Sequence, residues 1–203
     1  MEIIKKEYRL CPCCMEQHEV QTVKFKDHTI FKGVDVSFEN ISLYCSLADE
    51  CFEEDKMISD NDVAVKDAYR KQTGLLTSSD IIALRDKYGI TQSDLCLLLG
   101  WGGKTISRYE GHQVQDAAHD MVLKKLGEDP EWFIELLDKA KGQIAEDVYK
   151  KYMEAALKLF GISYKVYLRK AVLSEGISAS DDGSYVIINA DKYIPSASIA
   201  ALR

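Results

Sequence analysis

The stretch Thr77–Gly111, TSSDIIALRDKYGITQSDLCLLLGWGGKTISRYEG, carries the clearest structural signal in this chain. Ser78 or Ser79 can cap a helix over 80–88, which Gly89 then ends, and Thr91 can cap a second helix over 92–99. The glycine-rich run 100–103 predicts a turn, and a third short helix follows over 104–110. Two short helices joined by a glycine-containing turn are typical of a helix-turn-helix unit.

Three later segments, 116–127, 130–140 and 144–160, repeat apolar residues at helical spacing. The first two would complete a five-helix domain over 78–140. Beyond residue 161 the pattern fades, although Tyr185–Ile188 fits a short strand. We therefore treat 141–203 as a helical C-terminal extension of unknown role.

Five of the six cysteines lie within the first 51 residues, whereas Cys96 lies in an apolar run and is expected to be a small buried side chain. The N-terminus lacks the pattern of a secretory signal, so clustered thiols indicate metal binding rather than disulfides. Cys11 and Cys14 form a Cys-x-x-Cys pair, the spacing that grips one side of a tetrahedral Zn²⁺.

The second half of this predicted zinc site is less regular, because Ala48 stands where a second Cys-x-x-Cys would place its last thiol. The predicted zinc ligands are therefore Cys11, Cys14, Cys45 and Cys51. Three nearby side chains are possible substitutes: Cys13, His18 and Asp49. The alternative is a metal-free module held by packing alone.

Period-2 alternation over Val20–Phe25, Thr29–Phe38 and Ile41–Tyr44 predicts a small antiparallel sheet, with breaks at residues 27–28 and 39–40. So few residues make a thin core, which favours a metal staple. We expect a zinc-ribbon-like β module over 1–62 and a linker over 63–77 that contains a helix at 64–72. The expected class is α+β, mainly α.

Composition limits the possible functions. The chain has 203 residues with 26 Lys+Arg and 33 Asp+Glu, a formal net charge of −7. This balance argues against a protein that coats nucleic acid without sequence preference. The segment from Arg85 to Glu110, however, has four basic and three acidic side chains, and this local balance fits a small surface that reads DNA sequence. No apolar run approaches the length of a membrane span, so we expect a soluble cytoplasmic protein. None of the common catalytic motifs occurs, and we expect no enzyme and no catalytic residues.

Cys11-Pro12-x-Cys14 ahead of a β module, followed by the segment Thr91–Glu110, resembles the MqsA (YgiT-type) zinc-finger/helix-turn-helix antitoxins, whose DNA-binding domain is of the Xre/Cro type. The resemblance implies that the zinc module neutralises a toxin protein. It also implies that the helix-turn-helix domain forms a homodimer, binds a palindromic operator and represses its own promoter.

The resemblance also suggests residue roles. Arg108 matches the base-contacting arginine of the family, and Lys104 stands where the family presents a base-contacting asparagine. An arginine can pair bidentately with guanine O6 and N7. The residues expected to contact DNA are Gln92, Lys104, Thr105, Ser107 and Arg108, and Gln92 is expected to contact a phosphate. The alternative for Arg108 is a solvated charge or a salt bridge to Glu110 or Asp94.

Two functions are therefore expected from the sequence. The first is an autoregulating repressor that serves as the antitoxin of a type II toxin–antitoxin module. The second is a stand-alone transcriptional regulator of a phage or mobile element, with an N-terminal module that senses metal or redox state.

Overall fold

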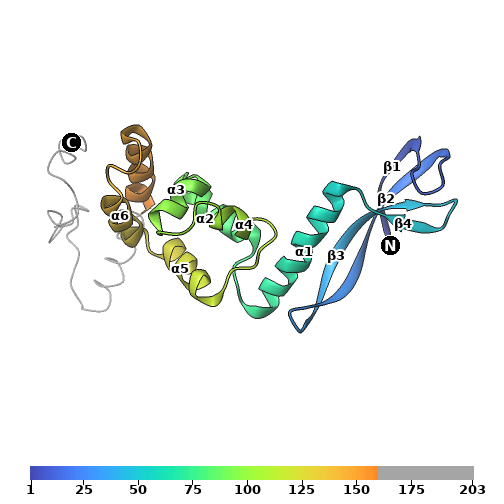
Figure 1. Ribbon diagram of the computed structural model, residues 1–203, viewed down its shortest axis with the longest axis horizontal. Helices are drawn as coiled ribbons and strands as arrows, with labels where there is room; N and C mark the ends of the chain where they lie inside the picture. Colours follow the sequence, from blue (N-terminus) through green and yellow to red (C-terminus); the bar gives the residue numbers. More distant parts are fainter. Residues whose placement is uncertain (160–203) are drawn as a thin grey trace, which may run out of the picture. The chain divides into compact units, whose positions relative to one another are not determined.

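The computed structural model describes residues 1–159, in which a four-stranded antiparallel sheet precedes a series of helices (Figure 1). The strands are β1 (Glu2–Leu10), β2 (Gln17–Phe31), β3 (Val34–Cys45) and β4 (Glu50–Phe52), in the spatial order β1-β2-β3-β4. The helices are α1 (Asp55–Thr73), α2 (Ser78–Tyr88), α3 (Gln92–Leu98), α4 (Thr105–Tyr109), α5 (Ala117–Glu128) and α6 (Pro130–Lys139), and another helix covers 146–159. The α+β class is confirmed for these residues, and the strand expected at Tyr185–Ile188 lies outside them.

The sheet is built on one long hairpin, β2–β3, and the strand breaks predicted at 27–28 and 39–40 are wrong. The chain reverses at Lys32 and Gly33, both with positive φ (50° and 78°). Polar residues continue through the strands because part of the hairpin is solvated, as the 2.8 Å ion pair between Lys24 and Glu39 illustrates. Strand β1 was not predicted, because nearly all of its side chains are exposed and it lacks an apolar face.

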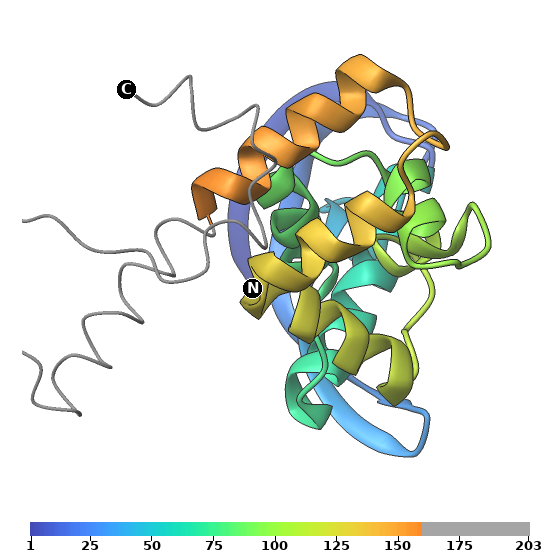
Figure 2. The same ribbon diagram turned by 90° about the vertical axis from the view of Figure 1, so that its left-hand side faces the viewer.

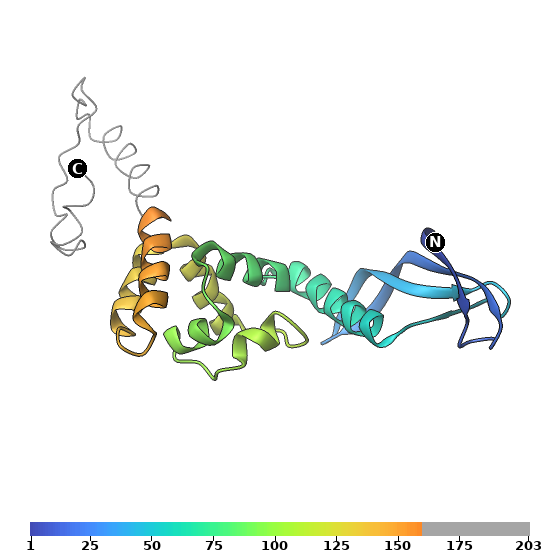
Figure 3. The same cartoon turned by 90° about the horizontal axis from the view of Figure 1, so that it is seen from above.

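Helix α1 is much longer than the predicted helix at 64–72, and the expected boundary at 62–63 falls inside it. It ends at Gly74, whose left-handed φ of 73° suits glycine. The helix packs against the β2–β3 hairpin (Figure 3). Buried Asn61 accepts a hydrogen bond from the Ile41 N–H (3.0 Å) and donates one to the Ile41 carbonyl (2.9 Å). Asp55, Asp60 and Asp62 thus lie on one packed helix, which the expected boundary divided between the β module and the linker.

The helices from α2 onward share one hydrophobic core, and their predicted bounds are confirmed to within two residues at each end. Local caps set these bounds: Thr77, rather than the expected Ser78 or Ser79, forms a capping box with Asp80 at α2, and Asp116 caps α5.

The expected domain boundary at residue 140 cuts through this core. Ile144, Tyr149, Tyr152 and Ala156 are all buried in it, and Figure 2 shows the helix at 146–159, in orange, beside α6. The Tyr152 hydroxyl donates to Asp94 (2.7 Å) and accepts from the Thr91 N–H (3.3 Å), at the start of α3. Residues 141–159 are thus part of the helical domain.

Among the described residues, no helix is both long enough and apolar enough to cross a membrane.

Candidate functional site

Four potential metal ligands converge at one end of the sheet. The ligand atoms of Cys11, Cys14, His18 and Cys45 all lie within 4.8 Å of one another. Cys11 follows β1, Cys14 lies in the β1–β2 turn, His18 is on β2 and Cys45 ends β3. Three thiols and one imidazole are a donor set typical of structural zinc sites. This group can hold a metal ion.

The backbone around the group bends to bring the thiols together. The Met15 N–H donates to the Cys11 carbonyl (2.8 Å), and Met15 itself adopts a left-handed φ of 62°. A non-glycine residue in that region indicates a turn held by its surroundings. The turn places Cys14 back beside Cys11, which is the geometry that a shared ion requires.

Backbone amides prepare Cys45 to be a thiolate. The Ala48 N–H donates to Cys45 Sγ at 3.3 Å. Burial acts to raise the pKa of this thiol, but hydrogen bonds from the backbone of Ala48 and Leu47, together with bonds to the Cys11 and Cys14 thiols, outweigh it, so the pKa of Cys45 lies below its ordinary value. The pKa of Cys11 is also lowered, because backbone hydrogen bonds from Cys14 and Cys13 and a bond from His18 together exceed the effect of burial. The thiolate is the form that binds metals.

The imidazole of His18 is oriented by its own strand. Its Nδ1 lies 3.0 Å from the Glu19 carbonyl oxygen, and its Nε2 lies 3.5 Å from Cys45 Sγ. When Nδ1–H donates to the carbonyl, the lone pair of Nε2 faces the sulfur atoms. Backbone carbonyls commonly fix metal-binding histidines in this way.

Cys51 is not in this group, contrary to the sequence-based expectation. It is exposed and pairs with Tyr44 across β3–β4, whereas Cys45 pairs with Glu50. Because successive residues of a strand point to opposite faces, Cys51 points away from the face that Cys45 uses. His18, which the sequence offered as a substitute, stands in its place.

The two other substitutes are occupied by different partners. Cys13 Sγ donates to Glu50 at 3.5 Å, and burial together with this carboxylate raises the pKa of Cys13 to about 11. Asp49 accepts a 2.6 Å hydrogen bond from the Tyr44 hydroxyl. Neither residue belongs to the group.

The second candidate site is the surface of α4 and the turn before it. Cys96, fully buried as expected, accepts hydrogen bonds from the Ile106 N–H at its sulfur (3.4 Å) and from the Trp101 N–H at its carbonyl (2.8 Å). These bonds fix the turn between α3 and α4. Ile106 and Tyr109 anchor α4 in the core. A helix of five residues is held by these tertiary contacts rather than by its own propensity.

Lys104 and Arg108 are exposed, and Thr105 and Ser107 are half-buried. The Arg108 N–H donates to the Lys104 carbonyl (3.1 Å), so the two residues lie one helical turn apart. Within residues 1–159 the guanidinium of Arg108 has no hydrogen-bond or ion-pair partner. Ser107 Oγ donates to the Lys104 carbonyl (3.0 Å).

The salt bridge considered for Arg108 is not found in the described chain, because both carboxylates have other partners. Glu110 accepts from Arg85 Nε (2.8 Å) and from Gln92 Nε2 (2.5 Å). Asp94 accepts from Tyr152. The amide of Gln92 thus links the start of α3 to the residue after α4.

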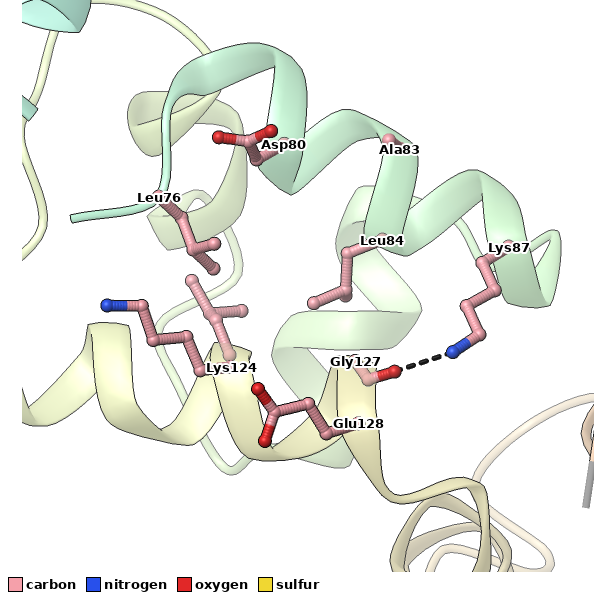
Figure 4. Close-up of a pocket in the computed structure, with 9 residues that line it drawn as sticks. Leu76, Asp80, Ala83, Leu84, Lys87, Lys124, Gly127 and Glu128 are labelled. Carbon is pink, nitrogen blue, oxygen red and sulfur yellow. Dashed lines mark hydrogen bonds between the residues drawn. The ribbon is translucent and has the colours of Figure 1, made fainter. Parts of the chain in front are cut away.

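A groove between α2 and α5 is separate from both sites (Figure 4). Leucine side chains form much of its floor, and Lys87 on its edge donates to the Gly127 carbonyl at 2.5 Å. None of the metal-group or α4 residues lines it.

No protein-family model matches the chain, and no curated protein matches it. The functional conclusion therefore depends on the chemistry of the metal group and of the α4 surface.

Proposed function

We propose that this protein is a sequence-specific DNA-binding repressor that reads a palindromic operator as a homodimer, in an Xre/Cro-type helix-turn-helix arrangement. The observation that carries the proposal is the pair Lys104 and Arg108, exposed one turn apart on α4, with the Arg108 guanidinium unpartnered within residues 1–159. An arginine held ready on a short rigid helix suits bidentate recognition of guanine.

The neighbouring residues complete the proposed interface. Lys104 would contact a base or a phosphate, and the hydroxyls of Thr105 and Ser107 would reach phosphate oxygens or base edges. The 2.5 Å bond to Glu110 uses one amide N–H of Gln92, so its second N–H is left for a phosphate at the rim. Rigid support beneath the helix limits the entropy lost on binding.

We propose that the N-terminal module holds Zn²⁺ and binds a protein partner, the toxin of a toxin–antitoxin module. Residues 1–62 contain fourteen acidic and seven basic side chains, so this module is repelled by DNA and attracts a basic partner. Of the large apolar side chains that are exposed in the described chain, nine lie within the first 47 residues: Met1, Ile3, Ile4, Tyr8, Leu10, Met15, Ile30, Ile41 and Leu47. This module therefore exposes apolar area that a protein partner could cover.

Selection of binding sites from a library of random duplexes tests the DNA proposal without knowledge of the operator. We expect enrichment of one palindrome, with half-sites about one helical turn, or ~34 Å, apart. The matched control is Lys139→Ala, which removes an exposed positive charge from α6; this variant should enrich the same palindrome. A library that stays random for the wild-type protein would reject the proposal.

A further inference from the structure

Helix α1 contacts both candidate sites, one near each of its ends. In its first turns, Met57 packs against the small core that contains Cys11 and Cys45. Near its last turn, Arg70 is fully buried and reaches the region of α4. One continuous helix therefore lies between the metal group and the proposed DNA-reading helix.

The guanidinium of Arg70 holds the end of α4 through backbone carbonyls. Its Nη2 donates to the carbonyls of Tyr109 (2.7 Å) and Gln113 (2.8 Å), and Tyr109 is the last residue of α4. Its Nε donates to Gln115 (3.0 Å), and its Nη1 donates to Asp67 on α1 itself (2.6 Å). A buried arginine is tolerated only when bonded in this way, so its bonds resist rearrangement.

The side chain of Tyr109 links the end of α4 to the turn before this helix. Its hydroxyl hydrogen-bonds to Nδ1 of His119 (2.5 Å), and the His119 ring stacks on Trp101 with the ring centroids 4.1 Å apart. The Trp101 and Tyr109 rings meet edge to face at 6.3 Å. Trp101 is thus a spectroscopic reporter of the α4 environment.

We propose that metal binding at Cys11, Cys14, His18 and Cys45 sets the position of α4 through α1 and Arg70, so that DNA affinity depends on the metal. Metal binding stabilises the end of the sheet on which Met57 packs, because a ligand stabilises the state that binds it. In the metal-free protein the first turns of α1 lose this support, and the α1–Arg70–Tyr109 connection transmits the change. Linkage requires that DNA, in turn, tightens metal binding.

The first arm of the test needs no DNA and does not depend on the proposed function. In the full chain carrying Trp132→Phe, Trp101 is the remaining tryptophan of the two. We expect Trp101 emission to shift when a chelator removes Zn²⁺ and to return when Zn²⁺ is restored. Far-UV circular dichroism checks that the helices persist without the metal. Unchanged emission on metal removal would overturn the proposal.

Two variants cut the connection at different points. Arg70→Met removes the bonds to α4, and Met57→Ala truncates the packing on the metal group without removing a ligand. Both should bind Zn²⁺ and lose the Trp101 response. Lys71→Met, which changes the exposed neighbour of Arg70, should keep it. A full response in Met57→Ala and, if it folds, in Arg70→Met would contradict the route through α1.

The second arm measures DNA binding and rests on the proposed function. On a selected palindrome, metal removal should lower the DNA affinity of the wild-type protein about tenfold, a typical size for coupling between sites. The DNA affinity of Met57→Ala should change by less than about twofold when the metal is removed. Equal wild-type affinity with and without Zn²⁺ would refute metal-dependent affinity. If no DNA sequence is preferred but Trp101 still responds, the proposed function fails while the connection through α1 stands.

Discussion

Arg85 Nε donates a 2.8 Å hydrogen bond to Glu110 Oε1, joining α2 to the residue that follows α4. The carboxylate side chain of Glu110 is 7% exposed and also accepts from Gln92. This bond, together with the bond from Arg70 to the Tyr109 carbonyl, holds the end of a helix too short to be stable by itself.

Glu110→Ala should destabilise the protein by about 1–3 kcal/mol, because Arg85 Nε and the Gln92 amide both lose their acceptor, while Arg85 keeps Asp86 and the Ile90 carbonyl. Urea unfolding measures this. The double variant Arg85→Met/Glu110→Met should lose less free energy of unfolding than Glu110→Ala alone. The exposed pair Glu146–Lys150 serves as the control, and Glu146→Ala should cost less than about 0.5 kcal/mol. Equal losses at Glu110 and Glu146 would contradict the structural role given to Glu110.

Metal analysis separates the observed ligand group from the one expected from the sequence. Protein purified without chelator should hold one equivalent of Zn²⁺, and His18→Ala should lose most of it because a tetrahedral site then lacks one donor. Cys51→Ser should keep the full equivalent, since Cys51 lies outside the group. Loss of zinc in Cys51→Ser together with retention in His18→Ala would show that the ligand group is misassigned.

The part of the fold that local chemistry determines was predictable from the sequence. Gly89 and Thr91 cap helices by bonds to residues close in the chain, as the pattern predicted, so the bounds of the helices between 78 and 139 followed closely from the sequence, although Thr77 rather than Ser78 or Ser79 caps α2. The choice between His18 and Cys51 depended on strand register, which the spacing of cysteines does not contain.

Polar contacts between residues far apart in the chain could not be predicted from the sequence. Arg70 is an ordinary charged residue in the sequence, and its partners in the region from Tyr109 to Gln115 are about forty residues away. The same holds for β1, whose exposed side chains carry no periodic signal, and for Tyr152, whose contact with Asp94 brings residues after 140 into the core.

Tyr152→Phe should destabilise the helical domain by about 1–2 kcal/mol, because Asp94 and the Thr91 N–H lose a buried hydroxyl partner. Chemical unfolding monitored by circular dichroism measures the effect. Tyr8→Phe, at a residue that is 73% exposed, is the matched control and should be neutral. A neutral Tyr152→Phe would mean that residues 146–159 do not stabilise the start of α3.

Asp120 should make stability sensitive to acid. Burial acts to raise its pKa, but bonds from Lys124, the Leu76 N–H and Gln115 prevail and hold the pKa below the ordinary value of 3.8. A depressed folded-state pKa contributes stability that is present above the unfolded value and is lost as pH falls toward the folded one. Urea midpoints measured between about pH 5 and pH 3 should therefore fall less steeply in Asp120→Asn than in the wild type. Glu128→Gln, an exposed change on α5, should follow the wild type, and parallel curves for Asp120→Asn and the wild type would refute the prediction.

Arg108→Ala should weaken binding to the selected palindrome by about 1–3 kcal/mol and relax base preference at one position of each half-site. Lys104→Ala should lower affinity and, if Lys104 contacts only phosphate, do so equally for all sequences while reducing the salt dependence. Competition with single-base variants of the palindrome distinguishes the two roles. Equal losses by Arg108→Ala on cognate and scrambled DNA would assign Arg108 to phosphate.

The central claim is that α4 reads DNA sequence, and fluorescence anisotropy with the region upstream of the protein's own gene tests it most directly. A scrambled duplex of equal length and a salt series provide the comparison. We predict binding to the upstream region at least about a thousandfold tighter than to the scramble. Equal, weak and strongly salt-dependent binding to both duplexes would contradict the claim.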